Sequence, residues 1–134
     1  EFLLKIYFIM KKLVSQGSKK TPKVFLDSKN GSFELKGNSI PEDPSGFYEP
    51  ILKKLEKYFQ SPQPLTHIQI NLNYFNSSSS KWIFNLLKLA KKYADEGHEI
   101  QIDWFIDEED EDSKETVLDY QNLLDIPIRV MEAS

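Results

Sequence analysis

The chain has 134 residues, a formal net charge of -4 and no cysteine, which excludes disulfides, thiolate nucleophiles and cysteine-based metal sites. Its length fits one domain around a single core, and 40% hydrophobic with 13% aromatic residues favours a folded chain over a disordered one. The net negative charge gives no indication of the basic surface that nucleic-acid binding requires. The lack of cysteine fits a cytoplasmic protein.

The N-terminal stretch is apolar but short. Residues 2–10, interrupted by Lys5, cannot span a bilayer and precede no signal-peptide cleavage site, so we expect no membrane insertion. Met10 followed by two lysines resembles a natural start, so we interpret residues 1–9 as upstream or vector-derived. An alternative is that this segment pairs with another chain or a sheet edge. We predict an extension over residues 1–19, vector-derived or flexible, and a single domain over 20–134.

The domain is predicted to begin with a β-hairpin. Two alternating segments, residues 23–27 and 32–36, flank Asn30-Gly31, which is a strong hairpin signal. A loop over residues 37–45 then leads into a helix over residues 44–60, where an apolar stripe recurs at the helical period. Two prolines directly after this helix end it.

A strand that runs into a serine-rich helix start follows. Ile68, Ile70, Leu72 and Tyr74 alternate with polar residues, which predicts a strand that is buried on one face. After Asn76 come four serines, residues 77–80, and the helical period begins at Trp82 and continues to Ala94. The serines therefore lie where a helix presents unpaired backbone N–H groups and the positive end of its dipole, a setting that suits a phosphate.

The remaining elements repeat this alternation of strand and helix. We predict a strand over residues 98–106, an acidic loop over 107–112, a helix over 113–124 and a last strand over 126–130. Since the strands are apolar on one face only, we expect a two-layer α/β fold. It has a mixed sheet of four to five strands, with helices packed mainly on one face, in which a hairpin is followed by βαβ crossovers.

Most candidate motifs have ordinary structural interpretations. His67 and His98 are interpreted as markers of strand edges, and no nucleophile elbow or glycine-rich phosphate loop is present, so we expect no enzyme and no catalytic residue. The acidic run lacks the spacing of a calcium loop and is expected to be solvated or to dock a basic partner, so we predict no metal or cofactor. Four aromatic residues match the buried stripes and are assigned to the core: Tyr74, Trp82, Tyr93 and Trp104.

Several short motifs, taken together, resemble those of a known family. They are Lys20-Thr21-Pro22-Lys23, Gly37-Asn38-Ser39-Ile40-Pro41-Glu42, Tyr74-Phe75-Asn76-Ser77-Ser78-Ser79 and Ile102-Asp103-Trp104-Phe105 before the acidic loop. In order and spacing they resemble the SiaC family of bacterial regulatory phosphoproteins, whose fold is like that of STAS-domain anti-sigma-factor antagonists. The resemblance extends over residues 20–132.

The resemblance implies a partner-switching adaptor. In that family the hydroxyl residue after the asparagine is phosphorylated by a dedicated kinase and dephosphorylated by a metal-dependent serine/threonine phosphatase. The phosphorylation state controls binding to an effector, which in the best-known branch is a diguanylate cyclase. By position the acceptor here is Ser77. Family members often have threonine there, whereas this chain has a serine followed by three more, so Ser78 is the alternative acceptor. The expected partner-binding residues are Ser39, Pro41, Glu42, Asn76, Ser77 and Ser78.

Two other functions are compatible with the same serine-rich junction. The helix start can serve as an anion site in a small-ligand or nucleotide-binding domain that is never phosphorylated. The chain can also be a constitutive scaffold, in which Asn76 or Ser77 only caps the helix. Replacing Ser77 by alanine separates these alternatives, because only a phosphoswitch needs that hydroxyl for its regulation.

Overall fold

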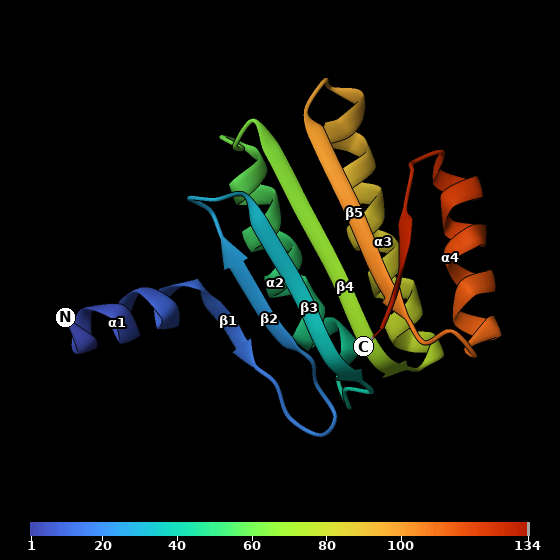
Figure 1. Ribbon diagram of the computed structural model, residues 1–134, viewed down its shortest axis with the longest axis horizontal. Helices are drawn as coiled ribbons and strands as arrows, with labels where there is room; N and C mark the ends of the chain where they lie inside the picture. The colour runs from blue at the N-terminus through green and yellow to red at the C-terminus, as the bar shows by residue number, and fades with distance from the viewer. Residues whose placement is uncertain (134) are drawn as a thin grey trace.

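The computed structural model describes residues 1–133, without the side chains of residues 7–11, so the last residue of the predicted domain, residue 134, lies outside the described residues. Six strands form one sheet in the order β1-β2-β3-β4-β5-β6 (Figure 1). The strands are β1 (Leu13–Gln16), β2 (Lys23–Asp27), β3 (Ser32–Ser39), β4 (Leu65–Phe75), β5 (Glu99–Ile106) and β6 (Arg129–Glu132). The helices are α1 (Phe2–Lys12), α2 (Pro44–Phe59), α3 (Ser77–Asp95) and α4 (Glu111–Leu124).

The α/β fold with a mixed sheet is confirmed, but the predicted strand count of four to five is wrong. The additional strand is β1, which pairs antiparallel with β2. Four residues are too short a stretch for alternation to be recognised, and the polar stretch after them reads as a linker. The sheet therefore begins within the stretch that was predicted to precede the domain.

The helix α1 extends away from the sheet at the N-terminal end of the chain (Figure 1). Its apolar residues Phe2 and Leu3 are 74% and 79% exposed. Neither α1 nor any other helix among the described residues is long and apolar enough to cross a membrane.

The topology is a hairpin followed by three crossovers, as predicted. Strands β2 and β3 are antiparallel, whereas β3, β4, β5 and β6 run parallel to one another. The connecting helices α2, α3 and α4 lie on the same side of the sheet (Figure 1), as right-handed crossovers between successive neighbours require. The carboxyl ends of β3 and β4 and the N-termini of α2 and α3 consequently meet at one edge of the sheet.

Several element boundaries differ from the prediction, and three of them have a clear cause. Strand β3 continues to Ser39, so part of the predicted loop is paired with β4. Helix α4 begins at Glu111, because Asp110 accepts the Ser113 N–H as its N-cap. Strand β6 begins at Arg129, and the two isoleucines before it are buried without pairing in the sheet. At β3 and β6 contacts with distant segments fix the boundary, whereas at α4 a local side-chain cap does, and the apolar period records neither.

The core lies between the sheet and the three helices. Its largest fully buried side chains include Trp104, Tyr48 and Phe33. Tyr93 is buried and Trp82 is partly buried against the same cluster, as predicted. The prediction for Tyr74 is wrong, because its side chain is 59% exposed.

A bulge explains the exposure of Tyr74. Between the register pairs Gly37↔Leu72 and Asn38↔Tyr74 the strand β4 carries one extra residue, Asn73. The extra residue reverses the alternation of faces beyond it, so Tyr74 points outward. Phe75 instead contacts the core, with its ring centroid 5.8 Å from that of Trp104.

Candidate functional site

The serine run starts helix α3, and Asn76 caps it. The Asn76 Oδ1 atom accepts the Ser79 N–H at 2.9 Å, and the Asn76 carbonyl accepts the Ser80 N–H at 2.9 Å. The Asn76 N–H itself donates to the Ser39 carbonyl at the end of β3. The helix start thus leaves the N–H groups of Ser77 and Ser78 outside the helical hydrogen-bond ladder, at the positive end of the dipole.

The four serines do not share one environment. Ser77 and Ser78 are exposed, Ser80 is half-buried and Ser79 is fully buried. The Ser79 hydroxyl donates to the Ser39 carbonyl at 2.8 Å, and the Ser80 hydroxyl contacts the hydroxyl of Tyr120 on α4. A modifying enzyme that needs a free, solvent-accessible hydroxyl therefore meets it at Ser77 and Ser78.

A network of buried hydroxyl groups connects this helix start to β3 and α2. Ser39 donates to the Ser79 hydroxyl at 2.8 Å and also contacts the hydroxyl of Tyr48 on α2. All three side chains have no exposed surface, and burial raises the pKa of Tyr48 above its usual value. The ring of Tyr48 also stacks on that of Trp82 at 6.2 Å between centroids. The network ties β3, α2 and α3 together at the edge where the serines lie.

The last residue of β3 and the segment that follows it adjoin the same edge. Ser39 and Pro41 are buried, whereas the Glu42 side chain is 83% exposed and pairs with the Lys20 ammonium at 2.9 Å. The hydrogen bond from Lys20 lowers the pKa of the Glu42 carboxyl. Of these three predicted partner-binding residues, Glu42 is thus the one whose side chain a partner reaches.

Helix α4 contacts the site through Tyr120, a residue that no motif in the sequence indicates. The Tyr120 hydroxyl donates to the Ser80 carbonyl at 2.9 Å, and partial burial raises the pKa of Tyr120. A pocket of about 270 Å³ lies between the end of β4 and the start of α4, and Tyr74 and Asp112 are among its lining residues. The acidic start of α4 is therefore close to the strand that leads into the serine run.

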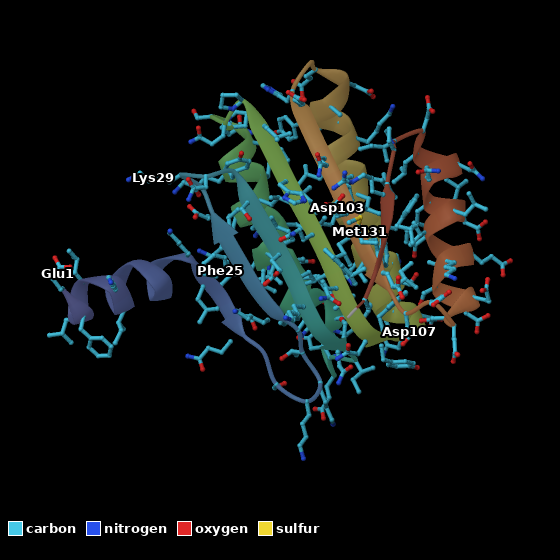
Figure 2. The ribbon with its side chains drawn as sticks, viewed as in Figure 1. Glu1, Phe25, Lys29, Asp103, Asp107 and Met131 are labelled. Atoms are coloured by element: carbon cyan, nitrogen blue, oxygen red, sulfur yellow. The ribbon has the colours of Figure 1, made fainter. Side chains whose placement is uncertain are left out.

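The two histidines lie away from the serines. His67 was predicted to mark a strand edge, which is wrong, because it lies within β4 and its Nε2 atom is 2.7 Å from Asp103 Oδ2. Arg129 on β6 binds the same carboxylate with two nitrogens, at 2.7 and 3.0 Å. Figure 2 shows Asp103 within the sheet, away from Asp107, which directly follows β5. The contacts of Asp103 with His67 and Arg129 thus link strands β4, β5 and β6.

The Asp103 carboxylate is almost completely buried beneath its two partners, with 3% of its side chain exposed. The hydrogen bond from Arg129 holds the pKa of Asp103 at about 2. Within residues 1–133 no group of three or more potential ligand side chains is placed to hold a metal ion.

Comparison with known proteins identifies the family. The model of the SiaC family of regulatory phosphoproteins matches residues 15–133. The chain belongs to the SiaC family. An uncharacterised protein of Pseudomonas aeruginosa (strain UCBPP-PA14) is 22% identical over 114 residues, which cover 85% of this chain and 90% of that protein.

Solved SiaC structures share the fold. Apo-SiaC from Pseudomonas aeruginosa matches with a TM-score of 0.80 at 20% identity, over 87% of this chain and 95% of that one. SiaC in complex with the diguanylate cyclase SiaD, of which it is the activator, matches with a TM-score of 0.82 at 21% identity, over 89% and 98% of the two chains. At these identities the structural match establishes the SiaC fold.

Proposed function

We propose that this protein is a non-enzymatic, cytoplasmic phosphoswitch. A dedicated kinase phosphorylates Ser77, a metal-dependent serine/threonine phosphatase reverses the modification, and the phosphorylation state controls binding to an effector. The observation that carries the proposal is the division of the serine run: Ser77 and Ser78 expose their hydroxyls, whereas Ser79 is buried. Family membership supports the same function, since the family is one of regulatory phosphoproteins. Ser78 is the alternative acceptor.

The start of α3 can hold a phosphate without a change of fold. Phosphorylation adds about 1.5 to 2 negative charges at neutral pH, beside two backbone N–H groups and the positive end of a helix dipole. Asn76 and the buried Ser39–Ser79 contact keep this end in place before and after modification. The change is therefore one of surface charge, which alters docking through electrostatic repulsion and desolvation.

The proposed partner surface is the edge around the serines. Asn76, Ser77, Ser78 and Glu42 supply side chains that are exposed or half-buried there. Ser39 and Pro41 are buried, so in this proposal they support the surface from within and do not contact the partner. The effector is a diguanylate cyclase, by analogy with the Pseudomonas aeruginosa SiaC that activates SiaD.

The test is phosphosite mapping by mass spectrometry on the protein isolated from its own host. We expect one phosphate on Ser77, absent from Ser77→Ala and retained in the matched control Ser78→Ala. Purified phosphorylated and unphosphorylated forms are then compared for binding to a diguanylate cyclase of the same organism, and we expect their affinities to differ. A phosphate retained in Ser77→Ala and lost in Ser78→Ala would move the acceptor to Ser78.

The absence of phosphate under every growth condition would contradict the phosphoswitch. The two N–H groups at Ser77 and Ser78 would then favour an anion site for a small ligand. Thermal stabilisation by a phosphate-bearing compound, reduced in Asn76→Ala, would support that function through mass action. Equal effector binding by Ser77→Ala and the fully modified protein would favour a constitutive scaffold.

A further inference from the structure

A second polar concavity lies at the opposite end of the sheet from the serines. It has a volume of about 370 Å³ and is formed where β1 and β2 meet the C-terminal half of α2. Its lining residues are Lys12, Val14, Leu26, Ser28, Lys54, Lys57, Tyr58 and Ser61. Figure 2 shows Lys29, in the turn that follows Ser28, at one end of the sheet and Asp107, the residue directly after β5, at the other. The pocket and the proposed phosphoacceptor are therefore separate sites.

The charged groups that line the pocket are all cationic. Three lysines are among its lining residues, none of the lining residues carries a carboxylate, and two lining serines have hydroxyls that can donate as well. The Lys12 ammonium is held by the Asp27 carboxylate at 3.1 Å, just beyond the lining. Lys54 and Lys57 make no ion pair within the described part of the chain. The chain as a whole has a net charge of -4, so the positive charge around this pocket is opposite in sign to that of the whole chain.

The spacing of these two lysines favours an anion between them. Lys54 and Lys57 are three residues apart on α2, so they are neighbours on one helix face and repel each other. An anion with several acceptor oxygens removes this repulsion and accepts hydrogen bonds from both ammonium groups. Phosphate is negatively charged and has several acceptor oxygens, so it can bind both lysine ammonium groups at once.

The floor of the pocket is apolar. It is formed by Val14, Leu26 and the ring of Tyr58. The Tyr58 hydroxyl is already engaged, with the Thr66 hydroxyl at 2.7 Å and the Gln63 N–H at 3.1 Å. Tyr58 is 6% exposed, so only a small part of its ring is available to a ligand. A cationic rim over an apolar floor, in the volume range of small-molecule sites, fits a ligand with an anionic head and a flat or apolar body.

We propose that this pocket binds a small, soluble phosphorylated molecule. Its phosphate lies between Lys54 and Lys57, and its body packs on Leu26 and Tyr58. The site is independent of the proposed phosphoswitch, because none of its lining residues belongs to the serine run or the segment after β3. Its ligand makes this protein responsive to a metabolite in addition to any modification at Ser77.

The experiment is an NMR titration of the full chain, labelled with nitrogen-15, with inorganic pyrophosphate at low ionic strength. We expect saturable shifts of the backbone amides of Leu26, Ser28, Lys57 and Ser61. The variant Lys54→Gln/Lys57→Gln should bind roughly tenfold more weakly, the effect of losing two solvent-exposed charge contacts. The matched control Lys53→Gln/Lys88→Gln removes the same charge from exposed positions outside the pocket and should retain the affinity of the unmodified chain.

Three results would overturn the proposal. They are no shift of these amides at millimolar pyrophosphate, equal weakening in both double variants, or shifts confined to the amides of Ser77 and Ser78. A second arm identifies the source of the phosphate. Binding of ADP at least as tight as that of pyrophosphate supports a soluble ligand with a flat body, whereas binding only to phosphatidylglycerol vesicles would assign the surface to lipid headgroups. Neither arm depends on phosphorylation of Ser77.

Discussion

Ser39 at the end of β3 donates a hydrogen bond of 2.8 Å to the hydroxyl of Ser79 in the first turn of α3, 40 residues further along the chain. Ser79 in turn donates to the carbonyl of Ser39, and both side chains are completely buried. This reciprocal contact fixes the start of α3 against the sheet. It separates a structural serine from the two exposed serines that precede it.

The first prediction concerns this division. Ser79→Ala should lower the free energy of unfolding by about 1–2 kcal/mol, because it removes buried hydrogen bonds and leaves the partners of Ser79 less satisfied. Ser78→Ala should change it by less than about 0.5 kcal/mol, as is usual for exposed positions. Urea denaturation of both variants measures the difference. If Ser78→Ala lowered the free energy of unfolding as much as Ser79→Ala does, the assignment of Ser79 as the structural serine would be contradicted.

The second prediction concerns the helix cap. Asn76→Ala removes the acceptor of the Ser79 N–H and should destabilise the fold by about 1 kcal/mol. Asn76→Asp keeps an acceptor oxygen and adds a negative charge near the helix N-terminus, so its stability should be close to that of the unmodified chain. Thermal unfolding compares the two variants. If aspartate were as destabilising as alanine, capping would not be the role of Asn76.

The third prediction is a pH dependence that originates at Asp103. Its pKa in the folded state is about 2, chiefly because Arg129 donates hydrogen bonds to it, against an ordinary value of 3.8. Since the folded-state pKa is lowered, the stabilisation is fully present above the unfolded-state value and is lost as the pH falls from about 4 to about 2. The contribution at neutral pH is roughly 2 kcal/mol.

Comparison with Asp103→Asn over a pH series measures this contribution. The difference in unfolding free energy between the unmodified chain and the variant should be largest near neutral pH and should narrow steadily below pH ~4. Glu99→Gln, at an exposed position on the same strand, serves as the control and should show a small difference at every pH. A gap between the unmodified chain and Asp103→Asn that stays constant down to pH ~2 would rule out this ion pair as its source.

The fourth prediction tests whether Tyr74 belongs to the effector surface. The side chain is 59% exposed and two residues before the helix cap, and exposed tyrosines are frequent anchors of interfaces. Tyr74→Ala should alter stability by less than about 0.5 kcal/mol and weaken effector binding by about tenfold. Calorimetric titration with the diguanylate cyclase measures the affinity. Leu123→Ala, at a 73% exposed position on α4, should leave the affinity unchanged.

The sequence by itself determined the elements whose signals are local. The change from a period of two to the helical period located the junction between β4 and α3, and the short-range capping preference of asparagine placed the start of that helix. Parallel crossovers with helices on one side followed from strands that are apolar on one face only. These features depend on residues within a few positions of one another.

Only the tertiary structure decided which side chains at the junction are accessible. Four adjacent serines are equivalent in sequence, and they differ because Ser39 and Tyr120, each 40 residues from its serine partner, engage Ser79 and Ser80. Tyr74 points outward because the register of β3 against β4 creates a bulge. Hydrogen bonds and strand registers between distant segments leave no periodic signal in the chain, so the exposure of Ser77 and Ser78 is set by the folded structure.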